Sequence, residues 1–142
     1  MDETPWVDRL LAVHPALTEA DREAIGDWRG TPLSADEEAG DDVPPPTVRL
    51  AGLGRAYAGH APEFSERQAA ELFRILEAVP ANGDEYGWDA AATGFLEALM
   101  NEWDRGFDLA EVWHLTGPRV REYCRAWNRL SGVESPAWMI EG

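Results

Sequence analysis

The stretch SERQAAELFRILEAV, residues 65–79, decides the fold class of this chain. Ser65 and Gln68 have the spacing of a capping box, in which each side chain accepts a hydrogen bond from a backbone N–H at the start of a helix. The apolar residues that follow recur at intervals of three and four, at Ala69, Leu72, Phe73, Leu76 and Val79. This periodicity predicts a helix with one buried face, ended by Pro80 and a turn at Asn82-Gly83.

The same helical signals recur on both sides of this stretch, and strand signals do not. Apolar stripes, start signals and stop signals predict further helices over residues 4–11, 18–30, 48–58, 85–103, 108–115 and 118–130. Gly52 and Gly54 weaken the helix expected over 48–58, whereas the capping-box spacing of Asp108 and Glu111 supports the one over 108–115. We therefore expect an all-α fold, a single compact domain of about six to seven helices over residues 1–142, packed as antiparallel pairs.

The helix over residues 18–30 has clear signals at both ends. Thr18 and Asp21 stand three residues apart, as in a capping box, and Gly30 is typical of a helix stop. Its apolar positions are Ala24, Ile25 and Trp28.

Two segments fall outside this helical pattern. Residues 31–46, TPLSADEEAGDDVPPP, combine proline, glycine and five acids, so we expect an exposed, mobile loop. A loop of this length in a compact domain is more often functional or disordered than a plain connector. The tail, residues 133–142, holds the apolar cluster PAWMI at 136–140. This cluster either folds back onto the domain or meets another chain, and we favour folding back.

The chain is strongly acidic. It carries 27 Asp and Glu against 12 basic residues, all of them Arg, for a formal net charge of −15. Residues 1–42 hold 12 acids and three Arg, a net of −9, and form the acidic pole of the sequence. Such a field repels nucleic acids and anionic membranes and attracts basic proteins. The first residues are not typical of a secretory signal and no apolar run is long enough to span a bilayer, so the expected location is the cytoplasm.

Each candidate for catalysis or metal binding has a stronger structural explanation. Glu111 and His114 have the spacing of half a di-iron site, but the sequence holds no second Glu-x-x-His. Cys124 lies on the apolar stripe of the helix over 118–130, where a free cysteine usually packs as a small apolar residue. A row of arginines at every fourth position favours a solvated face paired with acids over a phosphate site, at Arg121, Arg125 and Arg129. We expect no cofactor, no metal and no catalytic residue.

Exposed acids and aromatic residues point instead to protein binding. The first candidate set lies in the loop and comprises Asp36, Glu37, Glu38, Asp41 and Asp42. The second lies at the start of the helix over 85–103 and comprises Asp84, Glu85, Tyr86, Trp88 and Asp89. Carboxylates steer a basic partner towards a surface, and buried aromatic side chains then hold it. For Trp88, a place in the core is an equally supported alternative.

The second half of the chain resembles a known group of proteins. FLEALMNEW at 95–103 and LTGPRVREYCRAWNRLSGVESP at 115–136 are similar to a pattern found in short, helical bacterial proteins of unassigned function. The resemblance covers residues 45–136 and rests on Phe95, Leu96, Glu97, Gly117, Pro118, Tyr123, Cys124, Trp127 and Gly132. It implies that the chain resembles cognate immunity proteins of bacterial toxins. The acidic segment 31–44 is not part of the pattern, and no catalytic residues carry over.

The leading hypothesis is therefore an immunity protein or antitoxin that binds and blocks a cognate toxin protein with a basic surface. The alternative is a DNA mimic or regulatory module that occupies a nucleic-acid-binding protein. A small enzyme is the third possibility, and it would need a concave pocket with a strongly perturbed carboxylate or histidine.

Overall fold

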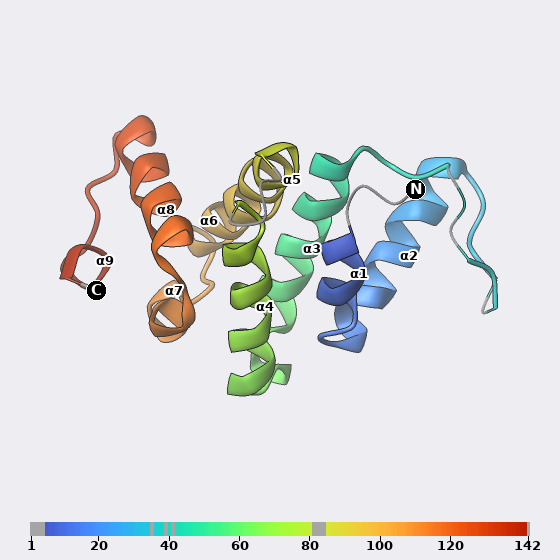
Figure 1. The fold of residues 1–142 in the computed structure, drawn as a ribbon, viewed down its shortest axis with the longest axis horizontal. Helices are drawn as coiled ribbons and strands as arrows, with labels where there is room; N and C mark the ends of the chain where they lie inside the picture. The colour runs from blue at the N-terminus through green and yellow to red at the C-terminus, as the bar shows by residue number, and fades with distance from the viewer. Residues whose placement is uncertain (1–4, 35, 39, 41, 81–84, 142) are drawn as a thin grey trace.

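The structure is a row of helices that follow one another along the longest axis of the molecule (Figure 1). It is a computed structural model and describes residues 5–34, 36–38, 40, 42–80 and 85–141. The elements are α1 (Pro5–Leu11), α2 (Pro15–Arg29), α3 (Pro46–His60), η1 (Ala61–Glu63), α4 (Glu66–Ala78), α5 (Glu85–Ala90), η3 (Ala91–Leu96), α6 (Glu97–Trp103), α7 (Leu109–Val112), η4 (Trp113–Leu115), α8 (Pro118–Ser131) and α9 (Ala137–Glu141).

The predicted all-α fold is confirmed. All seven predicted helices are present, with α5, η3 and α6 forming the helix expected over 85–103, and no strand occurs in the described residues. Neighbouring helices alternate in direction, as α3 and α4 do in Figure 1, so the expected antiparallel pairing is also confirmed. Within the described ranges, no helix is both long and apolar enough to cross a membrane.

The start of α2 corrects one prediction. The helix begins at Pro15 rather than Thr18, because His14 is its N-cap and the His14 Nδ1 atom accepts a hydrogen bond from the Ala16 N–H at 3.0 Å. Proline suits the first position of a helix, where its missing N–H costs nothing. Asp21 consequently lies inside the helix, where it is 5% exposed. Its carboxylate accepts two hydrogen bonds from Arg49 of α3, at 3.0 and 2.7 Å, and so joins α2 to α3.

Most other predicted helix ends are where the sequence indicates. Ser65 and Gln68 form the complete capping box at the start of α4. Gly30 and Gly132 end α2 and α8 in the left-handed conformation, with φ of 85° and 73°, which glycine adopts without strain. Asp108 precedes α7 as expected, but its side chain makes no capping hydrogen bond, so the predicted capping box is absent there.

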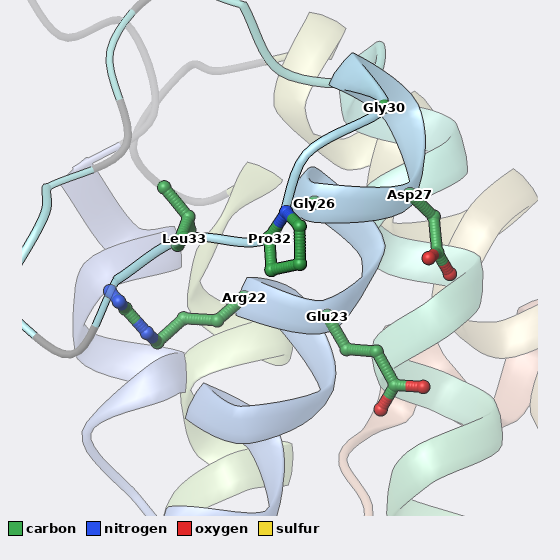
Figure 2. Close-up of a pocket in the computed structure, with 7 residues that line it drawn as sticks. All are labelled: Arg22, Glu23, Gly26, Asp27, Gly30, Pro32 and Leu33. Atoms are coloured by element: carbon green, nitrogen blue, oxygen red, sulfur yellow. The ribbon is translucent and has the colours of Figure 1, made fainter.

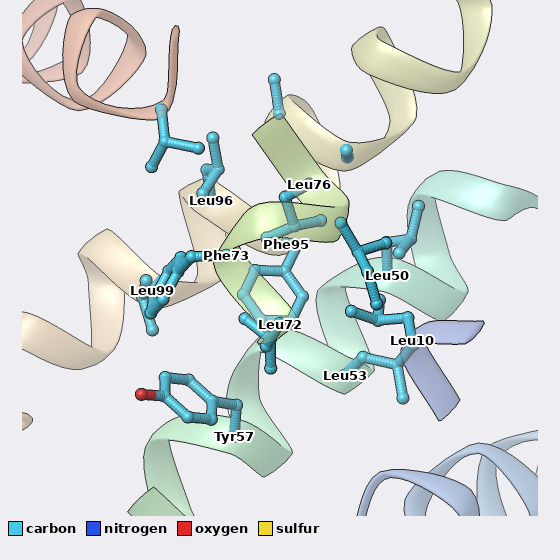
Figure 3. Packing of buried hydrophobic residues seen from close by; sticks show 14 of the residues in the cluster. Leu10, Leu50, Leu53, Tyr57, Leu72, Phe73, Leu76, Phe95, Leu96 and Leu99 are labelled. Carbon is cyan, nitrogen blue, oxygen red and sulfur yellow. The ribbon is translucent and has the colours of Figure 1, made fainter. Parts of the chain in front are cut away.

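The core runs between α1, α3, α4 and the long helix of α5, η3 and α6. Figure 3 shows ten of its labelled side chains meeting between these elements, Leu10, Leu50, Leu53, Tyr57, Leu72, Phe73, Leu76, Phe95, Leu96 and Leu99. All are 1% exposed or less. A buried Leu or Phe contributes roughly 1.5–3 kcal/mol relative to an exposed one, so this cluster is the main source of stability.

Two glycines set the crossing of α3 and η3. A Cβ atom at Gly54 would lie 2.6 Å from the Phe95 carbonyl oxygen, and one at Gly94 would lie 2.5 Å from the Thr47 carbonyl oxygen. Only glycine leaves room for backbones this close. Around Gly94 the long helix widens to a π-helical turn, in which the Glu97 N–H bonds to the Ala92 carbonyl. Gly54, which weakens the helix by propensity, is therefore required by packing.

The first turn of α8 is completed by a residue of α4. Gly117 has no side chain to cap the helix, and Glu77 supplies the missing acceptor. Its carboxylate accepts hydrogen bonds from the N–H groups of Arg119 and Val120, at 2.8 and 3.0 Å. A negative charge at this end of a helix also suits the helix dipole.

The apolar cluster of the C-terminal tail folds back onto the domain, as favoured from the sequence. It forms α9, in which Met139 is fully buried. The Trp138 ring meets the rings of Trp103 and Trp113 edge to face, with centroids 5.7 and 5.5 Å apart. Arg125 of α8 donates a hydrogen bond to the Met139 carbonyl at 3.0 Å.

Candidate protein-binding surface

The outer face of α2 carries a row of carboxylates. Glu19, Glu23 and Asp27 recur every four residues, a spacing that places them on one side of a helix, and all three are exposed. The opposite side holds the buried residues Leu17 and Ile25. The charge pattern of α2 thus follows from its amphipathic sequence.

Trp28 lies at the end of the same helix and is 53% exposed. Ile25, three positions earlier on the same helix, is by contrast 1% exposed. An exposed indole next to carboxylates is a feature of protein-binding surfaces.

The loop 31–46 is held against α2 by two arginines in its described part. The Arg29 guanidinium pairs with the Glu37 carboxylate through two hydrogen bonds, of 2.7 and 2.9 Å. Arg22 donates to the carbonyl of Glu37 at 2.9 Å. Ser34 and Glu37 form a turn, in which the Glu37 N–H donates to the Ser34 carbonyl at 3.0 Å. This stretch of the loop therefore has a defined conformation.

Glu37 consequently differs from the other acids of the loop. The hydrogen bonds from Arg29, with a further one from the Ser34 N–H, lower the pKa of Glu37 from 4.5 to about 2. Both groups favour the charged carboxylate. Because this carboxylate is already paired inside the molecule, it is less available to a partner than its neighbours.

The remaining predicted loop acids are exposed where they are described. Asp36, Glu38 and Asp42 are all exposed, and Asp41 lies outside the described residues. Together with the exposed residues of α2 they make up one end of the molecule, which we call the acidic end. It consists of Glu19, Glu23, Asp27, Trp28, Asp36, Glu38 and Asp42.

A shallow pocket of about 350 Å³ lies between α2 and residues 30–33 (Figure 2). Pro32 sits over Gly26, where an added Cβ would be 3.1 Å from the Pro32 Cα, so glycine allows the loop to lie close to the helix. The carboxylates of Glu23 and Asp27 project on one side of the pocket and the Arg22 side chain on the other. The described lining contains no Ser, Thr, Cys or His side chain.

The second predicted set lies elsewhere. Glu85, Tyr86 and Asp89 are exposed on α5, and Tyr86 is 66% exposed, whereas Asp84 is outside the described residues. Trp88 is half-buried and meets the ring of Tyr123 edge to face, with centroids 6.4 Å apart. Figure 1 places α5 near the middle of the molecule and the loop 31–46 at one end, with α3 between them. The structure does not bring the two sets together.

The residues considered for chemistry have structural roles. Cys124 is fully buried, as predicted, and burial raises the pKa of its thiol to about 12, which suppresses the reactive thiolate. His114 Nε2 lies 3.0 Å from Glu66 Oε1, and both side chains are exposed. In the described part of the chain, no cluster of three or more His, Cys, Asp or Glu could hold a metal ion.

The arginine row on α8 follows its prediction only in part. Arg125 and Arg129 pair with Glu122, at 3.3 and 3.2 Å, as expected for a solvated face. Arg121 instead turns inward. It donates to the Thr116 hydroxyl and the Trp113 carbonyl, both at 2.9 Å, and its guanidinium lies 5.5 Å from the centre of the Trp113 ring.

Comparison of the chain with protein-family models, with curated proteins and with solved structures finds no match.

The acids of α2 and Trp28 are the part of this surface that was missed from the sequence. A signal for the acids was present in the four-residue spacing of Glu19, Glu23 and Asp27. No comparable signal marked the exposure of Trp28.

Proposed function

We propose that this protein is an immunity protein or antitoxin that binds a toxin with a basic surface and blocks its active site. The observation that carries the proposal is the acidic end, which combines exposed carboxylates of α2 and the loop with the exposed indole of Trp28. Carboxylates accelerate encounter with a basic protein, and a desolvated Trp supplies affinity. The protein acts by occupying a surface and has no catalytic activity of its own.

The use of arginine within the molecule supports this proposal. Arg29 and Arg49 bind acids of the same chain, and Arg22 binds loop carbonyls. These contacts hold the acidic end in shape while leaving its other carboxylates exposed. The field outside the molecule is therefore strongly negative at that end, as a basic partner requires.

The proposal includes a cytoplasmic location and a partner that is a protein rather than a nucleic acid or a membrane. The single Cys124, buried and unpaired, is compatible with a reducing compartment. A net charge of −15 opposes binding to phosphate backbones and anionic lipids.

Co-expression tests the biological role. The genes that flank the one for this protein are the source of candidate toxin domains, and cells that express such a toxin domain should grow when the protein is also expressed. A variant with Trp28→Ala should protect them less well, whereas Tyr86→Ala, which removes an exposed aromatic residue from the second set, should protect them fully. Failure of the unaltered protein to restore growth would exclude the immunity function.

Association kinetics test the role of charge. Changing Glu38→Gln with Asp42→Asn should slow association with that toxin domain and flatten its salt dependence. The pair Asp104→Asn with Glu134→Gln removes the same charge from exposed positions elsewhere and should have a smaller effect. Equal effects of the two pairs would show that the acidic end is not the contact surface.

Competition with duplex DNA separates this function from a DNA mimic. A toxin that is not a nuclease should bind the protein equally well with and without DNA. A partner from which DNA displaces the protein at physiological salt favours the mimic.

A further inference from the structure

A second groove lies where the end of α3, the start of α4 and the α7–η4 segment converge. Its volume is about 440 Å³, within the range of small-ligand pockets. Three aromatic residues are among those that line it, namely Tyr57, Phe64 and Phe107. The acids among its lining residues are Glu66, Asp108 and Glu111.

The hydroxyl of Tyr57 is the unusual group in this groove. Tyr57 is 1% exposed, and its ring packs edge to face against Phe64 and Phe107, with centroids 4.9 and 5.9 Å apart. In Figure 3 the hydroxyl points away from the cluster of leucines. Among the described residues it has no hydrogen-bond partner in the protein. The ring of Tyr57 is thus buried while its hydroxyl is open to the groove, where it can bond to a ligand.

Tyr57 stays neutral in this setting. Burial, reinforced by the nearby negative charge of Glu111, raises the pKa of its hydroxyl to about 12. A neutral phenol can accept a hydrogen bond from a cationic N–H group and donate its own proton to a carboxylate.

The charged residues around the groove favour a positively charged ligand. Asp108, Glu111 and Glu66 are exposed carboxylates, and His114 is the one basic group in the described lining. His114 is already paired with Glu66, at 3.0 Å. No arginine lines the groove in its described part, so an anion would meet repulsion and a cation attraction.

Aromatic walls with carboxylates at the edge match an arginine side chain. Its methylene stem can pack on apolar surface, and its planar guanidinium can stack on aromatic rings. It also carries five N–H donors, enough for both a hydroxyl and a carboxylate. A lysine ammonium is more strongly hydrated and lacks the planar shape, so it fits the groove less well.

We propose that this groove binds an arginine side chain of another protein, with the stem against Phe64 and Phe107 and the guanidinium directed to Tyr57 and Glu111. None of these residues belongs to the acidic end. The groove would therefore bind arginine whether or not the protein is an immunity protein.

Nuclear magnetic resonance with isotope-labelled protein tests the binding. Nα-acetyl-arginine amide should cause saturable shifts of amide signals in residues 57–66 and 107–115, with a dissociation constant in the millimolar range. Nα-acetyl-citrulline amide has the same shape without the charge and should bind at least about tenfold more weakly, since a charge-assisted contact is lost. Equal binding of the two probes, or shifts only outside these ranges, would overturn the proposal.

Two variants test the residues. Glu111→Gln removes an exposed charge and should weaken arginine binding about three- to tenfold, and Tyr57→Phe should do so by a similar factor. Glu38→Gln, in the loop, is the matched control and should leave binding unchanged. If Tyr57→Phe does not fold, Glu111→Gln alone decides, because an unchanged affinity in that variant would exclude the groove as the site. Tighter binding of Nα-acetyl-lysine amide than of the arginine probe would also contradict the assignment.

Discussion

At the level of single residues, the contact with Arg29 favours the charged form of the Glu37 carboxylate. Arg29 lowers its pKa from 4.5 to about 2 in the folded protein, whereas in the unfolded chain it returns to its ordinary value. The folded state therefore binds this proton less readily than the unfolded state. The resulting stabilisation is complete above about pH 4.5 and disappears as the pH falls towards 2.

We expect this titration to be visible directly. The side-chain carbon signal of Glu37 should titrate with a midpoint near 2, and Arg29→Gln should move that midpoint back towards 4.5. Glu37→Gln should remove the corresponding part of the acid-induced loss of stability. An unchanged midpoint in Arg29→Gln would show that the Arg29 contact does not cause the shift.

Individual residues also mark the limit of sequence interpretation. The burial of Cys124 followed from its place on an apolar stripe, and the structure confirms it. The pairing of Glu37 with Arg29 could not be predicted. The two residues are eight positions apart, and they meet only because the loop folds back onto the end of α2. The inward turn of Arg121 likewise depends on Trp113, which reaches it only through tertiary packing.

At the level of elements, the crossing of α3 and η3 depends on two small residues. We expect Gly54→Ala to destabilise the protein by about 1–3 kcal/mol, because its Cβ would lie 2.6 Å from the Phe95 carbonyl oxygen. Gly59→Ala lies in the same helix with nothing within 4 Å of its Cβ. This control should stabilise the protein by up to about 1 kcal/mol through helix propensity. Urea denaturation measures both, and changes of the same sign would contradict this account.

The attachment of α9 can be tested by a pair of neighbouring residues. Met139 is fully buried and Ile140 is 64% exposed. We expect Met139→Ala to lower the free energy of unfolding by about 2–4 kcal/mol, because it leaves a cavity beneath α9. Ile140→Ala should change it by less than about 0.5 kcal/mol. Similar losses in both variants, measured by thermal or urea denaturation, would mean that α9 is held in some other way.

Helix existence was easier to predict than helix ends and helix geometry. Apolar spacing and the Ser65 capping box located α4 closely, since these signals are local. The early start of α2 was missed because a histidine cap is uncommon and Thr18 offered a more usual one. The π-helical turn of η3 has no local sequence signal, because it accommodates the close approach of α3 at Gly94.

At the level of the whole molecule, the net charge of −15 opposes the compact state. We expect the thermal midpoint of unfolding to rise when sodium chloride is increased from about 10 mM to about 0.15 M, because the Debye length falls from about 30 Å to about 8 Å. Exposed ion pairs weaken under the same conditions, but each contributes at most about 1 kcal/mol. The Asp104→Asn and Glu134→Gln double variant carries less charge and should respond less. A midpoint that falls with salt would show that attraction between the ion pairs outweighs repulsion.

The sequence indicated which residues of the loop belong to the candidate surface, but not how the two predicted sets lie relative to each other. The acidic loop was identified from its sequence, and Asp36, Glu38 and Asp42 are exposed. The distance along the molecule between this loop and α5 required the order of helices in space, which sequence periodicity does not provide. The groove around Tyr57 was not foreseen either, because its walls come from three separate parts of the chain.

The contact between Glu77 and the start of α8 has a consequence for the order of assembly. The N–H groups of Arg119 and Val120 find their acceptor more than forty positions earlier in the chain, so α8 gains its cap only when α4 has docked against it. Release of α8 and loss of this acceptor are then a single event. The rate of hydrogen exchange at those two amides therefore reports whether α8 is docked on α4, rather than the local fraying of α8.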